Sequence, residues 1–280
     1  MTSTRAEELA VRLRELRATA FRSGSAMARQ LGWQQTRVSK LETGAQLPTA
    51  ADLDAWVAAV GASPAVRDEL NDLLTRARVA VTMFGDHYRT PGAMTARQGR
   101  IAADEMQVSV LREYQPAMIP GIVQIAAYAR EALSAPGSAT LIGASADEIE
   151  NIVAARVRRQ AFLYESGKQV QLVLGEAALY TRFATTETLH GQLDRLVTFM
   201  DLPSVDLRVL PFTAASPVMP LAGVNIEDDR AVYMETLTDE QHVTDPEVVA
   251  AQLKSFELLH EVAVSGDEAV SLIQRAAHAL

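Results

Sequence analysis

Residues 26–48, AMARQLGWQQTRVSKLETGAQLP, indicate two short helices joined by a tight turn. The apolar residues that recur at helical spacing in the two halves are Ala28, Leu31, Val38 and Leu41. Gly32 and Trp33 interrupt the period between them, and Gly44 followed by Pro48 ends the second helix. We therefore predict that two short helices pack against each other at a corner.

The second of these helices exposes polar groups suited to nucleic acid. Its outward positions carry amides, hydroxyls and cations, namely Gln35, Thr36, Arg37, Ser39 and Lys40. Such groups hydrogen-bond base edges and phosphates, whereas an ordinary surface helix more often carries Glu and Lys pairs. The alternative is a generic helical hairpin, because a glycine after a helix and apolar residues at helical spacing occur in many small domains.

Charge is distributed unevenly along the chain and favours the first interpretation. Residues 1–50 hold eight Arg and Lys against four Glu, a net charge of +4, whereas the full chain has a net charge of −9. Residues 51–280 therefore carry a net charge of −13. A basic segment on an acidic protein fits a polyanion-binding head joined to a body that repels nucleic acid.

Three strings, LRELR at 13–17, LGW at 31–33 and VSKLE at 38–42, closely resemble the helix-turn-helix of the xenobiotic-response-element (XRE) and lambda-repressor family. The resemblance implies that the second helix enters the major groove. It places Gln35, Thr36, Arg37 and Ser39 in the groove and Lys40 on a phosphate, and Gln34 completes the predicted DNA-binding set.

Two positions bear on the local geometry of this motif. The family usually has Ser or Thr as the cap of the second helix, and Gln34 is a poorer cap. The resemblance also implies that Glu42 pairs with an arginine of the first helix, for which Arg14 or Arg17 would serve. The alternative for Glu42 is a solvated surface acid.

Composition bounds the rest of the molecule. A chain of 280 residues with 48% hydrophobic residues can bury a full core, and we expect two domains. The N-terminus is charged from Arg5 onward, and no apolar run approaches the roughly 18 residues that a membrane span needs. Zero cysteines exclude disulfides and thiolate metal sites. We expect a soluble cytoplasmic protein.

Helix signals predict a five-helix N-terminal domain over residues 1–79. The three helices beyond the helix-turn-helix are expected at residues 5–19, 49–61 and 64–78, with Thr49 as a cap and Trp56 in the core. Residues 80–99 then lose periodicity at Gly85, Pro91, Gly92 and Gly99, so they are the predicted linker.

Residues 100–280 mix the two periods. We predict helices at residues 101–112, 122–133, 147–165, 186–200, 245–262 and 266–278. We predict strands at residues 168–175 and 204–212, and a hairpin of residues 221–227 and 231–237. The pattern favours an α+β domain with a mixed sheet covered by helices. Within it, Arg156, Arg158 and Arg159 are expected to be solvated or paired internally, with a second polyanion contact as the alternative.

Several strings in this part, including IPGIVQ at 119–124, ARVRRQ at 155–160 and VLPF at 209–212, resemble the uncharacterised domain that follows this helix-turn-helix in many actinobacterial regulators. Such regulators are antitoxin-like and are often encoded beside a small acidic partner protein. The usual central motif is Pro-Gly-Leu-Leu-Gln-Thr, and here Ile125 stands where the threonine would be.

Motifs for catalysis are not found. The histidines at 87, 190, 242, 260 and 278 include no pair at i, i+4 spacing, and the sequence has no H-E-x-x-H, G-x-S-x-G or G-x-G-x-x-G. Four acids on or near predicted strands could converge as a carboxylate site, or could be sheet-edge charges: Glu176, Asp206, Glu227 and Glu235. We expect no enzymatic activity, no cofactor and no metal. An enzyme with a DNA-binding appendage is the less favoured alternative.

The sequence thus predicts a transcriptional regulator that reads double-stranded DNA as a homodimer. Its C-terminal domain would receive a signal from a small molecule or from the small acidic partner protein, and an antitoxin-like protein acting mainly through that partner is the alternative. The pocket for a small molecule is predicted between the sheet and the Pro-rich loop, lined by Tyr114, Met118, Tyr128, Phe183 and Met219.

Overall fold

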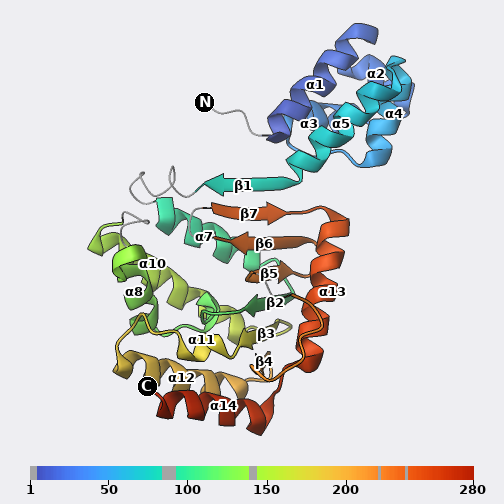
Figure 1. Ribbon diagram of the computed structural model, residues 1–280. Coiled ribbons are helices and arrows are strands. Elements are labelled where there is room, and N and C mark those ends of the chain that lie inside the picture. Colours follow the sequence, from blue (N-terminus) through green and yellow to red (C-terminus); the bar gives the residue numbers. More distant parts are fainter. Residues whose placement is uncertain (1–4, 84–92, 139–143, 220–221, 237–238) are drawn as a thin grey trace. The chain divides into compact units, whose positions relative to one another are not determined.

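The chain folds into two compact units, Met1–Ala80 and Val81–Leu280. The computed structural model describes residues 5–83, 93–138, 144–219, 222–236 and 239–280 (Figure 1). The boundary between the units lies next to the end of the predicted first domain at residue 79.

The first unit consists of five helices: α1 (Arg5–Ala20), α2 (Gly24–Leu31), α3 (Gln35–Thr43), α4 (Ala50–Val60) and α5 (Pro64–Ala77). Their ends follow from local chemistry. Thr49 and Asp52 form a reciprocal capping box at the start of α4, and Gly61 ends that helix in the left-handed conformation, with φ of 66°. Pro64 begins α5, where its missing N–H costs nothing.

Trp56 lies at the centre of this unit, as predicted. Its side chain is fully buried, and its indole Nε1 donates a hydrogen bond of 3.2 Å to the carbonyl oxygen of Leu13. The core around it is drawn from α1 to α5 and includes Leu9, Leu13, Met27, Val38, Leu41, Leu53 and Leu70. Since α3 supplies both Val38 and Leu41 to this core, its orientation is fixed by packing.

The second unit contains a mixed sheet with the strand order β1-β7-β6-β5-β2-β3-β4. The strands are β1 (Val79–Met83), β2 (Val110–Gln115), β3 (Gln169–Gly175), β4 (Val205–Leu210), β5 (Val224–Glu227), β6 (Ala231–Glu235) and β7 (Asp239–Val243). Strands β2, β3 and β4 are parallel neighbours, whereas β2 pairs with β5, β5 with β6 and β6 with β7 in antiparallel fashion. The predicted α+β class with a mixed sheet is confirmed.

Helices cover this sheet (Figure 1). They are α7 (Ala93–Glu105), α8 (Ala126–Ser134), α10 (Ala146–Arg159), α11 (Ala177–Tyr180), α12 (Thr186–Met200), α13 (Pro246–Val262) and α14 (Gly266–His278), with 3-10 turns η1 (Gly121–Val123) and η2 (Gln160–Tyr164). Helices α12 and α14 pack on β4, and α13 crosses β2, β4, β5 and β6.

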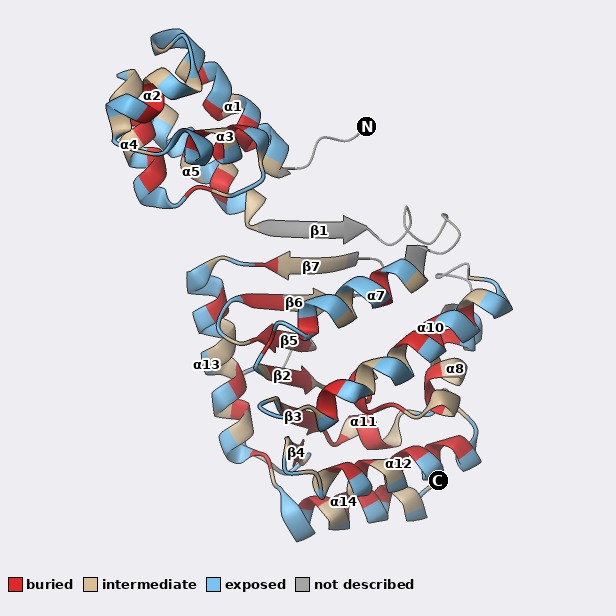
Figure 2. Cartoon of the chain, turned by 180° about the vertical axis from the view of Figure 1, so that it is seen from behind, coloured by how far each residue is buried: buried red, intermediate tan, exposed pale blue. Residues whose placement is uncertain are grey.

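One face of the sheet changes character from one end to the other. Around β3 and β4 it is apolar, and Leu172, Leu174 and Leu207 pack with α12 and α14 in the largest buried cluster. Because side chains alternate along a strand, the same face continues with Glu113, Gln115, Asn225 and Glu227 on β2 and β5. This second half is polar although it is largely buried (Figure 2).

The structure corrects several predicted elements. The helix predicted at residues 101–112 is wrong, since α7 ends at Glu105 and residues 110–115 form β2. The helix predicted at residues 122–133 instead begins as η1, and α8 starts at Ala126. Ser145 rather than Asp147 caps α10, which ends at Arg159 and gives way to η2. Strands β1 and β7 were not predicted.

The predicted linker, residues 80–99, is occupied at both ends by regular structure, because β1 runs to Met83 and α7 begins at Ala93. Its Gly85, Pro91 and Gly92, together with His87, lie outside the described residues.

Candidate functional site

Capping residues define the ends of α2 and α3 and so form the corner between them. Ser23 caps α2, its hydroxyl oxygen accepting a hydrogen bond of 3.2 Å from the amide of Ala26. Gly32 ends α2 with φ of 68°, and Gly44 ends α3 with φ of 73°. No side-chain hydrogen bond caps α3 at Gln34, as expected for an amide at this position.

Most of the predicted DNA-binding residues lie on the surface of α3 and its preceding turn. Gln34, Gln35, Thr36, Arg37 and Lys40 are exposed, while Ser39 is half-buried and its carbonyl oxygen accepts a hydrogen bond from Thr43. The helix therefore presents amide, hydroxyl and ammonium groups outward while Val38 and Leu41 face the core.

Arg37 is tied to its own unit. Its Nη2 lies 2.5 Å from Oδ1 of Asp52, a carboxylate that is 6% exposed at the start of α4. Its guanidinium also sits 4.5 Å from the centre of the Trp33 ring, within cation–π range. Both partners hold the guanidinium on the protein, so Arg37 joins α3 to α4. The Arg37 side chain is still 44% exposed, and its placement in the groove stays a prediction.

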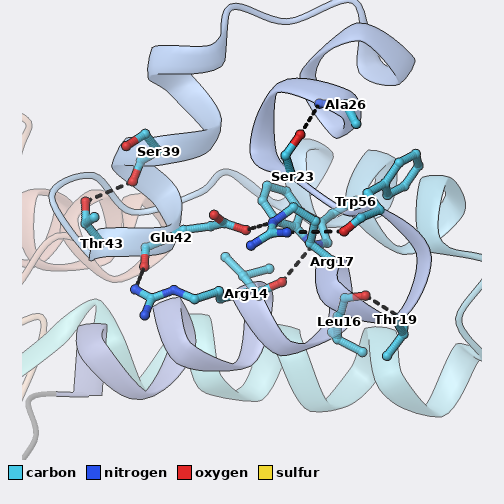
Figure 3. A network of polar contacts seen from close by, with 12 residues as sticks. Arg14, Leu16, Arg17, Thr19, Ser23, Ala26, Ser39, Glu42, Thr43 and Trp56 are labelled. Atoms are coloured by element: carbon cyan, nitrogen blue, oxygen red, sulfur yellow. Dashed lines mark hydrogen bonds and ion pairs between the residues drawn. The ribbon is translucent and has the colours of Figure 1, made fainter.

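Glu42 is the one acidic residue of α3, and its side chain is withdrawn from the surface. Arg17 Nε lies 2.5 Å from Glu42 Oε1, and Arg14 Nη2 donates a hydrogen bond of 2.5 Å to the Glu42 carbonyl oxygen (Figure 3). Glu42 is 9% exposed. The pairing implied by the family resemblance is confirmed, and the solvated alternative is wrong.

The second unit contains a cavity of about 560 Å³ between the polar half of the sheet, α7, α10 and the loop before α8. Of the five residues predicted to line a pocket here, Met118 and Phe183 do so. The polar residues of its wall are Arg97, Gln98, Glu113, Gln115, Gln124, Ser138, Arg156, Arg159, Asn225, Glu227, Tyr233, Glu235, Thr236 and Glu240.

The other three predicted pocket residues lie elsewhere. Tyr114 is buried on β2, and strand alternation directs it to the opposite face from Glu113. Tyr128 is fully buried beneath Phe183, with ring centres 4.8 Å apart, and burial raises its pKa to about 12. Met219 is 80% exposed and does not line the cavity.

The acids singled out in the sequence divide between the cavity and other places. Glu227 and Glu235 both line the cavity. Glu176 accepts a hydrogen bond of 2.7 Å from the amide of Phe212, and Asp206 lies 2.8 Å from Nε2 of His260. Sequence reasoning missed Glu113, because it directly follows the helix predicted at residues 101–112 and no strand was predicted there.

The arginines of the cavity wall have internal partners. Arg159 Nε donates to Glu105 at 2.9 Å, and its Nη1 donates to Gln98 at 3.0 Å. Arg156 donates to Gln124 at 3.0 Å, and Arg97 pairs with Glu240. The expectation that Arg156 and Arg159 pair within the protein is confirmed.

Burial sets the protonation of the two central carboxyls. It raises the pKa of Glu113 to about 7, against a hydrogen bond from Gln115 that favours the ionised form. It also raises the pKa of Glu227 to about 7, and the neighbouring charges of Glu105 and Asp104 act in the same direction. The floor of the cavity therefore titrates near neutral pH.

The described residues hold neither a cluster of metal-ligating side chains nor a helix that could span a membrane. No group of three or more His, Asp or Glu side chains gathers there in an arrangement that could hold a metal ion. No helix among them combines the length and the apolar character needed to cross a bilayer.

Comparison with solved structures gave weak likenesses. NucT from Helicobacter pylori is 13% identical, with a TM-score of 0.35, covering 67% of this chain and 98% of its own. TrmBL2, described as an archaeal chromatin protein with a novel mode of DNA binding, is 13% identical, with a TM-score of 0.34, covering 92% of this chain and 93% of its own. Neither likeness bears on function. The comparison with curated proteins found no match.

Family models account for both units. Residues 8–70 match the model described as "Helix-turn-helix domain". Residues 98–275, more than half of the chain, match the model described as "Domain of unknown function (DUF5753)". The chain therefore carries a helix-turn-helix domain and belongs to the DUF5753 family.

Proposed function

We propose that this protein is a sequence-specific, DNA-binding transcriptional regulator whose α3 enters the major groove in the manner of the XRE family. The observation that carries the proposal is the exposed surface of α3. It offers Gln35, Thr36 and Lys40 to the outside, and the carboxylate of Glu42 is withdrawn into a pair with Arg17. Amides and hydroxyls read base edges, and an ammonium group binds phosphate.

A fixed helix suits this task. Val38 and Leu41 anchor α3 in the core, Arg14 and Arg17 hold its last turn through Glu42, and Arg37 holds its first turn through Asp52. Groups presented by such a helix lose little conformational entropy on binding, since the backbone that carries them is already ordered.

The protein acts as a dimer in this proposal. One recognition helix contacts only a few base pairs, so useful specificity requires two helices placed one turn of DNA apart, roughly 34 Å. The operator would then have two-fold symmetric half-sites.

The second unit serves as the sensor, without catalytic activity or a cofactor. A cavity of about 560 Å³ lies within the range of small-molecule sites, roughly 300–1,000 Å³. Its acids lie on the sheet, its arginines on α7 and α10, and its apolar groups on the surrounding helices and loops, an arrangement that orients a ligand. This favours a small-molecule signal over a signal delivered only by a partner protein.

Fluorescence anisotropy with DNA from upstream of the gene, at two salt concentrations, tests DNA binding. We expect salt-dependent, saturable binding that exceeds binding to scrambled DNA. Q35A is expected to reduce affinity by about 1–3 kcal/mol and to relax sequence preference. R76A removes one exposed charge from α5 of the same unit and serves as the control. Salt-insensitive binding, or equal affinity for every genomic fragment, would overturn the proposal.

A further inference from the structure

The cavity floor is a continuous row of hydrogen-bonding side chains on three neighbouring strands. Glu113 of β2 stands directly opposite Asn225 of β5, and Asn225 stands opposite Tyr233 of β6. Paired residues project to the same face of the sheet, so these three side chains lie side by side. Glu227, two residues after Asn225 on β5, projects to that face as well.

Acceptor atoms on this floor have spare capacity. Within the described part of the chain, Asn225 Oδ1 is buried and receives no hydrogen bond. Glu227 is 9% exposed, and burial and then neighbouring charges are the largest influences on its pKa. Glu113 accepts one hydrogen bond, of 2.8 Å, from Gln115. A buried acceptor without a donor is costly, typically about 1–3 kcal/mol, so such atoms mark a place for a donor from outside.

The arginines of the cavity wall do not supply the missing hydrogen-bond donor to Asn225 on the floor. Arg97 pairs with Glu240 and Glu235, Arg159 with Glu105, and Arg156 with Gln124. These contacts place the guanidiniums beside Glu105, Gln124, Glu235 and Glu240, and Asn225 Oδ1 receives no hydrogen bond from the described residues. What the floor offers a ligand is therefore negative charge and carbonyl oxygen.

Apolar side chains stand beside the arginines on the other side of the cavity. Ile101 of α7, Leu133 of α8, Met118, Ile119 and Phe183 line it. A ligand that fits both sides has N–H donors and positive charge at one end and a compact hydrocarbon or aromatic body at the other.

We propose that the cavity binds a small organic cation, an amine or guanidine with an apolar body, whose N–H groups donate to Glu113, Glu227 and Asn225. This inference deepens the proposed sensor function by giving the chemistry of its signal. An organic cation is favoured over a metal ion, since no group of three or more metal-ligating side chains was found among the described residues. The protonation of the two glutamates near neutral pH supports the assignment, because a bound cation would restore their ionised forms.

Isothermal titration calorimetry on the full-length protein without DNA tests the assignment. The probes are phenylalkylamines and phenylalkylguanidines, each compared with the alcohol and the carboxylate of the same skeleton. We expect at least one cation to bind, at least tenfold more tightly than its alcohol, and the carboxylates not to bind. Dissociation constants above about 1 mM for every cation, or a preference for the alcohols or carboxylates, would overturn the proposal.

Variants locate the site. E227Q keeps the shape of the side chain and removes its charge, and we expect it to weaken the best cation on the order of tenfold or more. E261Q removes an exposed acid of α13 and should leave affinity unchanged. Equal losses in the two variants would contradict the site, provided that circular dichroism shows both folded. Because no DNA is present, these results are independent of whether the first unit reads DNA.

Discussion

Arg17 and Glu42 form a largely buried ion pair that joins α1 to the last turn of α3, with Nε and Oε1 2.5 Å apart and side chains 13% and 12% exposed. The pair holds the recognition helix from behind. Removing one member of such a pair leaves an unpaired charge in a poorly solvated place, which costs more than the pair itself contributes.

We therefore expect R17M to lower the unfolding free energy of the first unit by about 3 kcal/mol. Urea unfolding followed by tryptophan fluorescence measures this, since Trp33 and Trp56 both lie in that unit. The double variant R17M/E42L should recover most of the loss. R67A, which breaks the exposed pair with Asp54, should change stability by less than about 1 kcal/mol. A similar effect for R17M and R67A would contradict the role of the buried pair.

Substitutions at Arg37 and at Lys40 are expected to affect different properties, the first stability and the second DNA binding. R37M removes the partner of a buried carboxylate, so it should lower the unfolding free energy by about 1–3 kcal/mol. Well below the midpoint of unfolding, it should leave the salt dependence of DNA binding unchanged. K40A should leave stability within about 0.5 kcal/mol and reduce the slope of log affinity against log salt by about 1. Urea unfolding and anisotropy on the same samples separate the two roles. A reduced salt slope for R37M would place that guanidinium on DNA.

The titration of Glu113 and Glu227 makes the stability of the second unit depend on pH. Their pKa of about 7 in the folded state lies above the ordinary glutamate value of 4.5, so the folded state keeps protons that the unfolded state has lost. The contribution of these two carboxyls to the stability of the second unit is then fully present below pH 4.5 and is lost as the pH rises through about 7. The charged groups that shape these values are Arg159, Asp104, Glu105, Asp228, Arg230 and Glu235.

E227Q cannot ionise, so we expect it to be more thermostable than the natural protein at pH 8 and closely similar at pH 4.5. The difference in unfolding free energy at pH 8 is expected to be on the order of 3 kcal/mol at most, because the pKa of Glu227 is about 7 in the folded protein. Thermal unfolding between pH 4.5 and 8 measures it, with E261Q as the control. A difference that does not grow with pH would show that Glu227 is already ionised throughout.

Gly175, at the end of β3, is expected to tolerate no side chain. A Cβ atom there would lie 2.5 Å from the carbonyl oxygen of Pro116, and backbone cannot move aside as a flexible side chain can. We expect G175A to destabilise the second unit by about 1–3 kcal/mol. G137A, where a Cβ atom would meet nothing within 4 Å, is the matched control. Equal midpoints of thermal unfolding for the two variants would contradict this reading of the close approach.

The first unit was largely predictable because its signals are local. Ser23, Gly32, Gly44 and Thr49 each cap a helix next to them in the sequence, and Val38 and Leu41 repeat at helical spacing. The partner of Arg37 was not predictable in the same way. Asp52 is fifteen positions away in the next helix, and only the packing of α3 on α4 brings the two together.

The cavity could be predicted only in part, because β2, a strand of its floor, does not alternate between apolar and polar residues, the pattern from which a strand is predicted. In β2, Leu111 and Glu113 share the covered face, so the alternation of apolar and polar residues is lost and the segment resembles a helix. Phe183 and Met118 were found from their apolar character. Glu113 and Asn225 become neighbours through the pairing of β2 with β5, which the sequence does not reveal.

The polar half of the sheet has a further consequence, for how long the protein survives in the cell. Ionised glutamates beneath α7 and α10 weaken the second unit when the cavity is empty, so transient opening of that unit is more frequent. A ligand that binds only the folded form lowers the opened population. Proteases act on opened chains. The amount of regulator in the cell is therefore expected to rise with the concentration of its ligand, before any change in its affinity for DNA is considered.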